Sequence, residues 1–305
     1  MGSSKEAKAI VDLYRFMKGQ SATTSHDSIK DARYHFELCS TLTAEPTEVN
    51  YEEVGCPGTV RPAIWCKPSS ADATYVILYL HGGGCFMGSP SSHRKLAAHL
   101  AKAVGAYALV PDFRLAPQFR FPSQINDVVA TYKWLLECGY THKNIILAGD
   151  SAGGNLAITV PVKLREDGIG LPGGVMAISP WIDMEAKGES LDSNAQNDVF
   201  ATRGTEIYFS ELYLGTASPK LPAANPLYAD LTGLPPMHIS VGGWEVLLSD
   251  AERLAERARK AGVDITYEVG PEMQHVYQLM AGRAPEADRT IENMAQWLKE
   301  KVMSK

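Results

Sequence analysis

The chain lacks several features that mark whole classes of protein. It has no run of 18 apolar residues, so we expect no membrane-spanning helix. No basic cluster stands out and the formal net charge is −6, which argues against a nucleic-acid partner. The first residues show no apolar signal core, and Glu6 stands where N-myristoylation requires Ser or Thr. These absences favour a cytoplasmic protein that acts on a small molecule.

Cysteine is scarce, and no spacing suits a metal. The five cysteines are odd in number and scattered, which indicates a reducing compartment and mostly buried thiols. The glycines of segment 168–173 match a dinucleotide-binding pattern, but they follow an expected helix, and Pro172 breaks the helix they should open. We therefore expect neither a metal nor an organic cofactor. The cysteines are Cys39, Cys56, Cys66, Cys85 and Cys138.

What the chain does have is an alternation of strand-like and helix-like segments. Its 305 residues are 45% hydrophobic, enough for one large α/β domain with a lid. Helices are expected between the strands, for instance over 123–138 and 247–261. Alternation of this kind predicts a mostly parallel eight-stranded sheet with helices on both faces. The expected strands are 48–56, 59–66, 74–80, 106–111, 144–149, 174–179, 237–241 and 264–269.

The segment 149–153, Gly-Asp-Ser-Ala-Gly, carries the strongest local signal. An aliphatic run precedes it and a helical segment follows it. A strand, a G-x-S-x-G turn and a helix together are typical of a nucleophile elbow. Small residues are needed two positions before and after the serine, because side chains there would collide across the turn. Gly149 and Gly153 meet this need, so Ser151 is the candidate nucleophile.

A second glycine-rich loop follows the expected strand 74–80. It reads His-Gly-Gly-Gly over residues 81–84. Glycines let backbone N–H groups approach the oxyanion of a tetrahedral intermediate, and losing one such donor costs roughly 10²–10³ in rate. We assign the donors to Gly83, Gly84 and the N–H of Ala152, which lies at a helix N-terminus. His81 is interpreted as a structural residue of this loop.

Together these motifs resemble the hormone-sensitive-lipase-like esterases of the α/β-hydrolase fold. The resemblance covers roughly residues 60 to 300 and also includes segments 112–117 and 179–183. It departs from the family at Gln118, where an acid is usual. It implies a helical cap built from residues 1–45 and roughly 185–215 over a catalytic domain at 46–305. It also implies that dimers can form through the last edge strand, here 264–269.

The α/β-hydrolase order of Ser, acid and His places the base near the C-terminus. Of eight histidines, only His238 and His275 follow the serine. His238 lies inside an expected buried strand, whereas His275 lies in the loop after the last strand, so His275 is the candidate base. The family's acid block aligns Glu245 with the triad position. Asp250 and Asp183 are the alternatives.

These residues predict a serine carboxylesterase that acts through an acyl-enzyme, with short- to medium-chain acyl esters as substrates. Phe86, Met87, Trp181, Tyr208 and Phe209 could line an apolar pocket, or could simply pack in the core. Amide, carbamate and lactone hydrolysis use the same machinery and stay open. A non-catalytic receptor on this fold, like the plant gibberellin receptor, is disfavoured. That receptor lacks the triad histidine, whereas Ser151, His275 and an acid are all available in this chain.

Overall fold

The computed structural model describes residues 4–21 and 28–304. Eight strands form one sheet in the order β1-β2-β4-β3-β5-β6-β7-β8. The sheet is mixed. Strand β2 runs antiparallel to its neighbours β1 and β4, whereas the other six strands, β3 to β8, run parallel to one another. The strands are β1 Val49–Val54, β2 Ala63–Pro68, β3 Val76–Leu80, β4 Tyr107–Val110, β5 Ile145–Asp150, β6 Gly174–Ile178, β7 Met237–Gly242 and β8 Ile265–Gly270.

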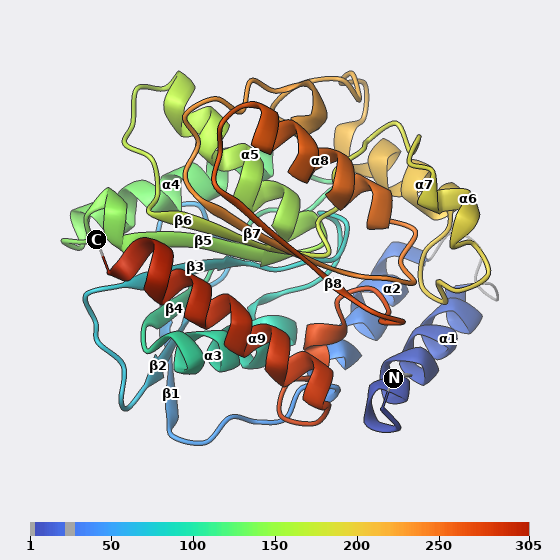
Figure 1. Ribbon diagram of the computed structural model, residues 1–305, viewed down its shortest axis with the longest axis horizontal. Coiled ribbons are helices and arrows are strands. Elements are labelled where there is room, and N and C mark those ends of the chain that lie inside the picture. Colours follow the sequence, from blue (N-terminus) through green and yellow to red (C-terminus); the bar gives the residue numbers. More distant parts are fainter. Residues whose placement is uncertain (1–3, 22–27, 305) are drawn as a thin grey trace.

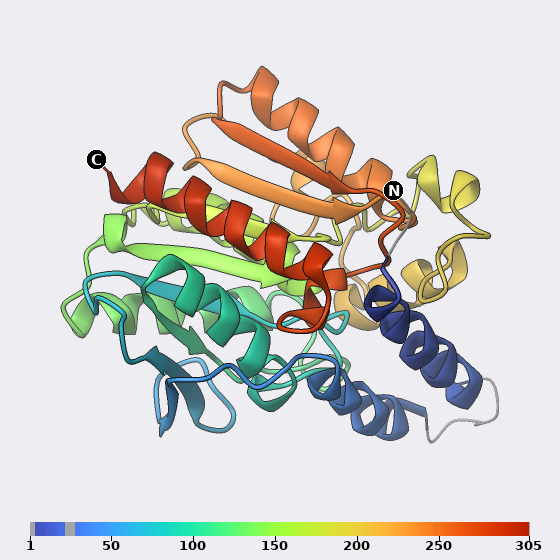
Figure 2. The same cartoon turned by 60° about the horizontal axis from the view of Figure 1, so that its bottom comes forward.

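Helices cover both faces of the sheet (Figures 1 and 2). On one face lie α4, α5 and α8, and on the other lie α3 and α9. This arrangement confirms the expected α/β-hydrolase layout, although the second strand starts at Ala63 and not at 59, because the chain bends at residues 60–61. The helices are α1 Ala9–Ser21, α2 Ser28–Phe36, α3 Pro90–Val104, α4 Ser123–Glu137, α5 Ala152–Glu166, α6 Ser190–Ser193, α7 Arg203–Leu214, α8 Leu248–Lys260 and α9 Pro285–Leu298.

The central strands are buried on both sides. Every residue of β3 is inaccessible to solvent, and its side chains alternate between two apolar layers. Leu78 and Leu80 pack beneath α4 and α5, whereas Ile77 and Tyr79 pack towards α3 and α9. A run of consecutive apolar residues is therefore what a central parallel strand requires.

Four helices gather where the parallel strands end. Helices α1 and α2 lie at the same end of the sheet as α6 and α7, although more than 150 residues separate the two pairs in sequence (Figure 1). Helix α7 begins at a capping box in which Thr202 and Thr205 bond to each other's backbone N–H. This end of the sheet therefore has a helical cover.

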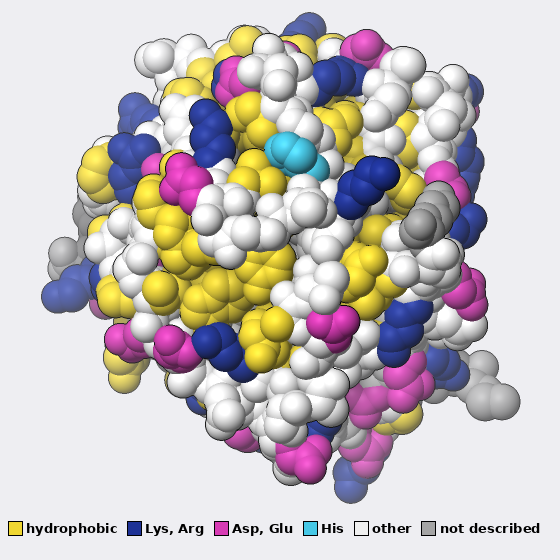
Figure 3. Space-filling view, turned by 90° about the vertical axis from the view of Figure 1, so that its left-hand side faces the viewer, with side chains coloured by type: hydrophobic (Ala, Val, Ile, Leu, Met, Phe, Trp, Pro, Cys, Tyr) yellow, Lys and Arg dark blue, Asp and Glu magenta, His cyan; other side chains and the backbone are white. Residues whose placement is uncertain are grey.

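The opposite end of the molecule, away from these four helices, is exposed to solvent. Figure 3 shows this face, where hydrophobic side chains gather near the centre and charged side chains of both signs surround them. Within the described ranges, no helix has both the length and the apolar character needed to cross a bilayer.

Candidate active site

The turn between β5 and α5 holds Ser151 in a strained backbone conformation. Its φ is +53° and its ψ is −118°, a region that non-glycine residues rarely adopt. A Cβ at Gly153 would lie 1.9 Å from the Leu80 carbonyl oxygen, and one at Gly149 would lie 2.5 Å from the Gly153 carbonyl oxygen. Only glycine fits at either position, so the two glycines allow the sharp turn that presents the serine.

The loop after β3 places two backbone N–H groups beside this turn. Gly83 has φ +104° and Gly84 has φ +60°, and both line one cavity with Ser151. A Cβ on Gly83 would lie 2.5 Å from the Met87 carbonyl oxygen. Neither glycine N–H donates to an acceptor in the described part of the chain. Ala152 opens α5, where the N–H also lacks an acceptor within the helix.

His275 faces the same cavity, bonded to a buried acid. Its Nδ1 lies 2.8 Å from Oε2 of Glu245, a fully buried side chain in the loop after β7. Burial lowers the pKa of His275, but the Glu245 carboxylate more than offsets this, and the net pKa is raised. No hydrogen bond joins Ser151 Oγ to His275 among the described residues. Such bonds often tighten only when substrate is bound.

The other acids and histidines considered from sequence have different partners. Asp183 and Asp250 both bind Arg253, at 2.9 and 2.8 Å. His238 lies in β7 with its Nε2 3.6 Å from a Glu268 oxygen. His81 stacks on a phenylalanine ring 4.2 Å away, and burial lowers its pKa to about 4. None of these side chains lines the cavity that holds the serine.

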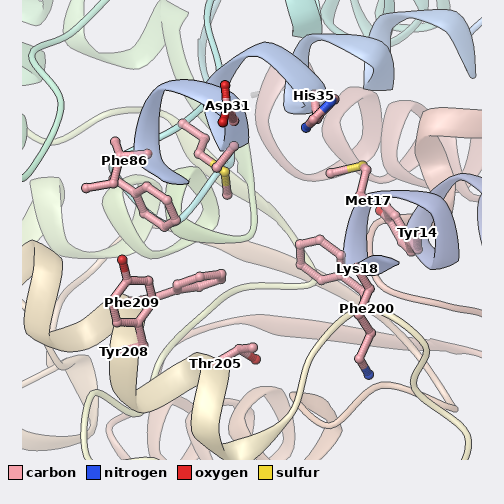
Figure 4. A pocket seen from close by; sticks show the side chains of 13 residues that line it. Tyr14, Met17, Lys18, Asp31, His35, Phe86, Phe200, Thr205, Tyr208 and Phe209 are labelled. Atoms are coloured by element: carbon pink, nitrogen blue, oxygen red, sulfur yellow. The ribbon is translucent and has the colours of Figure 1, made fainter. Parts of the chain in front are cut away.

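Two neighbouring cavities share Met87 and Phe209 in their linings, and Ser151 lines the smaller one, here called the inner cavity. The inner cavity has a volume of only about 20 Å³ and includes Met87, Trp181 and Phe209. The outer cavity has a volume of about 330 Å³ and is lined by Phe86, Met87, Tyr208 and Phe209, among others. Figure 4 shows aromatic rings from α1, α7 and the glycine-rich loop facing this space. All five residues expected to form a pocket therefore line one space or the other.

The described residues contain no group of three or more His, Cys, Asp or Glu side chains placed to hold a metal. The glycine-rich segment 168–173 connects α5 to β6 as a loop. A helix does not follow it, so it lacks the strand-turn-helix context of a dinucleotide site.

Comparison with known proteins decides the family. A family model described as the alpha/beta hydrolase fold matches residues 77–279. A crystal structure of an esterase from the bacterial hormone-sensitive lipase family is 40% identical, with a TM-score of 0.92, and the match covers 99% of this chain and 100% of that one. This chain belongs to the hormone-sensitive-lipase-like esterases.

Relatives identified by sequence are also ester hydrolases by name. The esterase is 41% identical over 230 residues to an acetyl-hydrolase of Streptomyces hygroscopicus, covering 75% of this chain and 77% of that protein. It is 32% identical over 262 residues to an esterase of Acinetobacter venetianus, covering 86% and 85% of the two chains.

Ser179 holds the acid of this esterase in place, a role that the sequence did not predict. Its φ is +43°, and its Oγ donates to Glu245 Oε1 at 2.5 Å and accepts from the Val276 N–H at 3.1 Å. It thus ties the buried acid to the residue after His275. Its sequence signals are its position directly after an apolar strand and its place in the family-like segment 179–183, and neither one predicts this role.

The covering segments also touch the esterase's histidine. Phe200 stacks on the His275 ring at 5.3 Å with an interplanar angle of 10°. The Tyr14 hydroxyl donates to the His275 carbonyl oxygen at 2.8 Å. Asp198 accepts from the N–H groups of Phe200 and Val246. Two segments distant in sequence therefore contact His275, one at its ring and one at its backbone, and local sequence patterns cannot show such contacts.

Proposed function

We propose that this serine carboxylesterase uses Ser151 as nucleophile, His275 as general base and Glu245 as the acid that orients the base. The observation that carries the proposal is the cavity that Ser151, His275, Gly83 and Gly84 share, with Glu245 hydrogen-bonded behind the imidazole. A nucleophile, a base and a third group that orients the base are the elements of nucleophilic acyl transfer.

The proposed reaction has two steps. Ser151 Oγ attacks the ester carbonyl carbon while His275 Nε2 takes the hydroxyl proton. The N–H groups of Gly83, Gly84 and Ala152 hold the resulting oxyanion. When the tetrahedral intermediate collapses, His275 gives its proton to the departing alcohol and an acyl-serine remains. Water, deprotonated by the same imidazole, then releases the carboxylic acid and restores the serine.

Cavity size and lining support short- to medium-chain acyl esters as substrates. The cavity that Ser151 lines is small, at about 20 Å³, and the outer cavity is a largely apolar space of about 330 Å³. The name of the Streptomyces hygroscopicus relative, an acetyl-hydrolase, agrees with a small acyl group. Phe86, Met87, Trp181, Tyr208 and Phe209 are the proposed substrate-contacting residues.

We also propose that residues 1–45 and roughly 185–215 act as a cap on the catalytic domain at 46–305. The contacts of Tyr14 and Phe200 with His275 support this division. Residues 1–3 and 22–27 of the cap lie outside the described residues.

A cytoplasmic location is proposed because all five cysteines are free. A homodimer through β8 is proposed because that strand lies at the sheet edge.

The decisive experiment is hydrolysis of p-nitrophenyl butyrate by the wild type and by Ser151→Ala. We expect kcat to fall by at least about 10³-fold in the variant. A fluorescent phosphonate should label the wild type and leave Ser151→Ala unlabelled. Ser193→Ala, at an exposed serine of α6, is the matched control and should behave as wild type. Full turnover by folded Ser151→Ala would contradict the assignment.

A further inference from the structure

A carboxyl group that the proposed mechanism does not use lies in the reactive cavity. Glu206 belongs to the first turn of α7 and is only 4% exposed. It lines the inner cavity together with Ser151, His275 and Trp181. A buried glutamate normally has a salt-bridge or hydrogen-bond partner, because leaving its carboxyl group unpaired costs free energy.

Glu206 has no such partner in the described ranges. No hydrogen bond or ion pair involves its carboxyl group there, although its backbone N–H bonds to the Thr202 carbonyl. The charged or titratable groups that act on it are His275, Asp250, Asp198 and Glu245. Three of these four are acids. Its surroundings therefore offer the carboxyl group no compensating cation other than the imidazole when that is protonated.

The surroundings favour the neutral acid. Burial is the main reason that the pKa of Glu206 is raised to about 8, and nearby Asp250, Asp198 and Glu245 add to the effect. The His275 imidazole, when protonated, and the helix N-terminus favour the carboxylate and lower this pKa, but they do not outweigh burial. At neutral pH the cavity therefore presents a carboxyl O–H, which can donate a hydrogen bond as a carboxylate cannot.

We propose that Glu206 is a specificity-determining residue that donates a hydrogen bond from its carboxyl group to a second oxygen of the substrate. The preferred substrates are esters that carry an ether, hydroxyl or carbonyl oxygen within a few atoms of the scissile ester. A purely hydrocarbon ester leaves this buried donor without a partner, and such mismatches reduce binding. The inference rests on the proposed function, since it places the second oxygen in the cavity of Ser151.

Two matched pairs of esters test the proposal. One pair is p-nitrophenyl methoxyacetate and p-nitrophenyl butyrate, which differ by one oxygen in the acyl chain. The other is 2-methoxyethyl acetate and butyl acetate, which differ by one oxygen in the alcohol. The quantity measured is the ratio of kcat/KM within a pair, compared among the wild type, Glu206→Gln and Glu206→Leu. Differences in intrinsic reactivity cancel in this comparison.

We expect Glu206→Leu to lower this ratio by about threefold to tenfold for at least one pair, the range for one net hydrogen bond. Glu206→Gln keeps an N–H donor and should keep the preference. Glu211→Leu, on the exposed side of the same helix, is the matched control and should leave both ratios at the wild-type value. Unchanged ratios in Glu206→Leu, or lost preference in Glu206→Gln, would overturn the proposal.

The wild type alone provides a second test, which does not depend on how the variants fold. Ionisation removes the donated proton, so the preference of the wild type for the oxygen-bearing ester should fall as pH rises through about 8. Titration of His275 affects both members of a pair and cancels in the ratio. A preference that is independent of pH would overturn the proposal. Hydrolysis of butyrate esters that does not depend on Ser151 would instead refute the proposed function.

Discussion

The imidazole of His275 depends on one carboxylate that lies 30 residues away in the chain. Glu245 accepts from His275 Nδ1 and from the Ser179 hydroxyl, and a third contact comes from the Gly242 N–H. With the Nδ1 proton held in this way, Nε2 is free to take the serine proton.

Replacing this carboxylate tests its role. In Glu245→Gln, the amide can still accept from Ser179, but its NH₂ group faces the Nδ1–H and favours the wrong tautomer. We expect kcat to fall by about 10³–10⁴ while the fold persists, as judged by circular dichroism and ester hydrolysis. The matched control is Asp250→Asn, which should stay within about threefold of wild type. Full activity in Glu245→Gln would move the role to Asp250 or Asp183.

The same pair sets the pH dependence of the esterase. His275 must be neutral to accept a proton. Because its pKa is raised, the imidazole becomes neutral only at a higher pH than an ordinary histidine would. Because burial alone lowers the pKa of His275, removing the negative charge in Glu245→Gln should move the acid limb of kcat/KM to lower pH. The measurement is the pH profile of residual activity in the variant. A limb that stays in place would show that Glu245 does not set this pKa.

At the scale of elements, the strand–turn–helix unit of β5 and α5 depends on glycine at two positions. A Cβ at Gly153 would lie within 2.8 Å of the carbonyl oxygens of both Leu80 and His81. No real side chain fits there without a shift of backbone. The same glycine therefore serves both the packing of α5 on β3 and the presentation of Ser151.

We expect Gly153→Ala to lower the free energy of unfolding by about 1–3 kcal/mol, which is typical of overpacking. The shift of the turn should also displace Ser151 and reduce esterase activity. Thermal unfolding and p-nitrophenyl butyrate hydrolysis measure the two effects. Gly55→Ala is the matched control, because nothing lies within 4 Å of a Cβ built there. Equal unfolding midpoints for both variants would contradict the steric argument.

For the whole molecule, β8 is one of the two edge strands of the sheet, and β1 is the other. Strand β8 pairs only with β7 among the described strands, and Val269 is 37% exposed. An unpaired edge strand can pair with a second copy of itself. This is the physical basis of the proposed dimer.

The dimer predicts a clear change in solution mass. We expect the wild type to have twice the mass of one chain in size-exclusion chromatography with light scattering, and Val269→Lys to dissociate towards the monomer. A charged side chain on the edge strand opposes pairing. Val60→Lys places the same charge at a more exposed valine outside the sheet and should remain dimeric. A monomeric wild type at high concentration would rule out this interface.

The sequence alone determined the fold family and the eight strands. It also singled out Ser151, Gly83 and Gly84 as candidates, because steric rules and hydrophobic runs act over a few neighbouring residues. Only the tertiary structure decided which acid reaches His275, that Ser179 and Phe200 hold this pair, and that Glu206 lies in the reactive cavity. These contacts join segments 30 to about 100 residues apart. Their formation depends on packing and on the sheet's strand order, which no local pattern records.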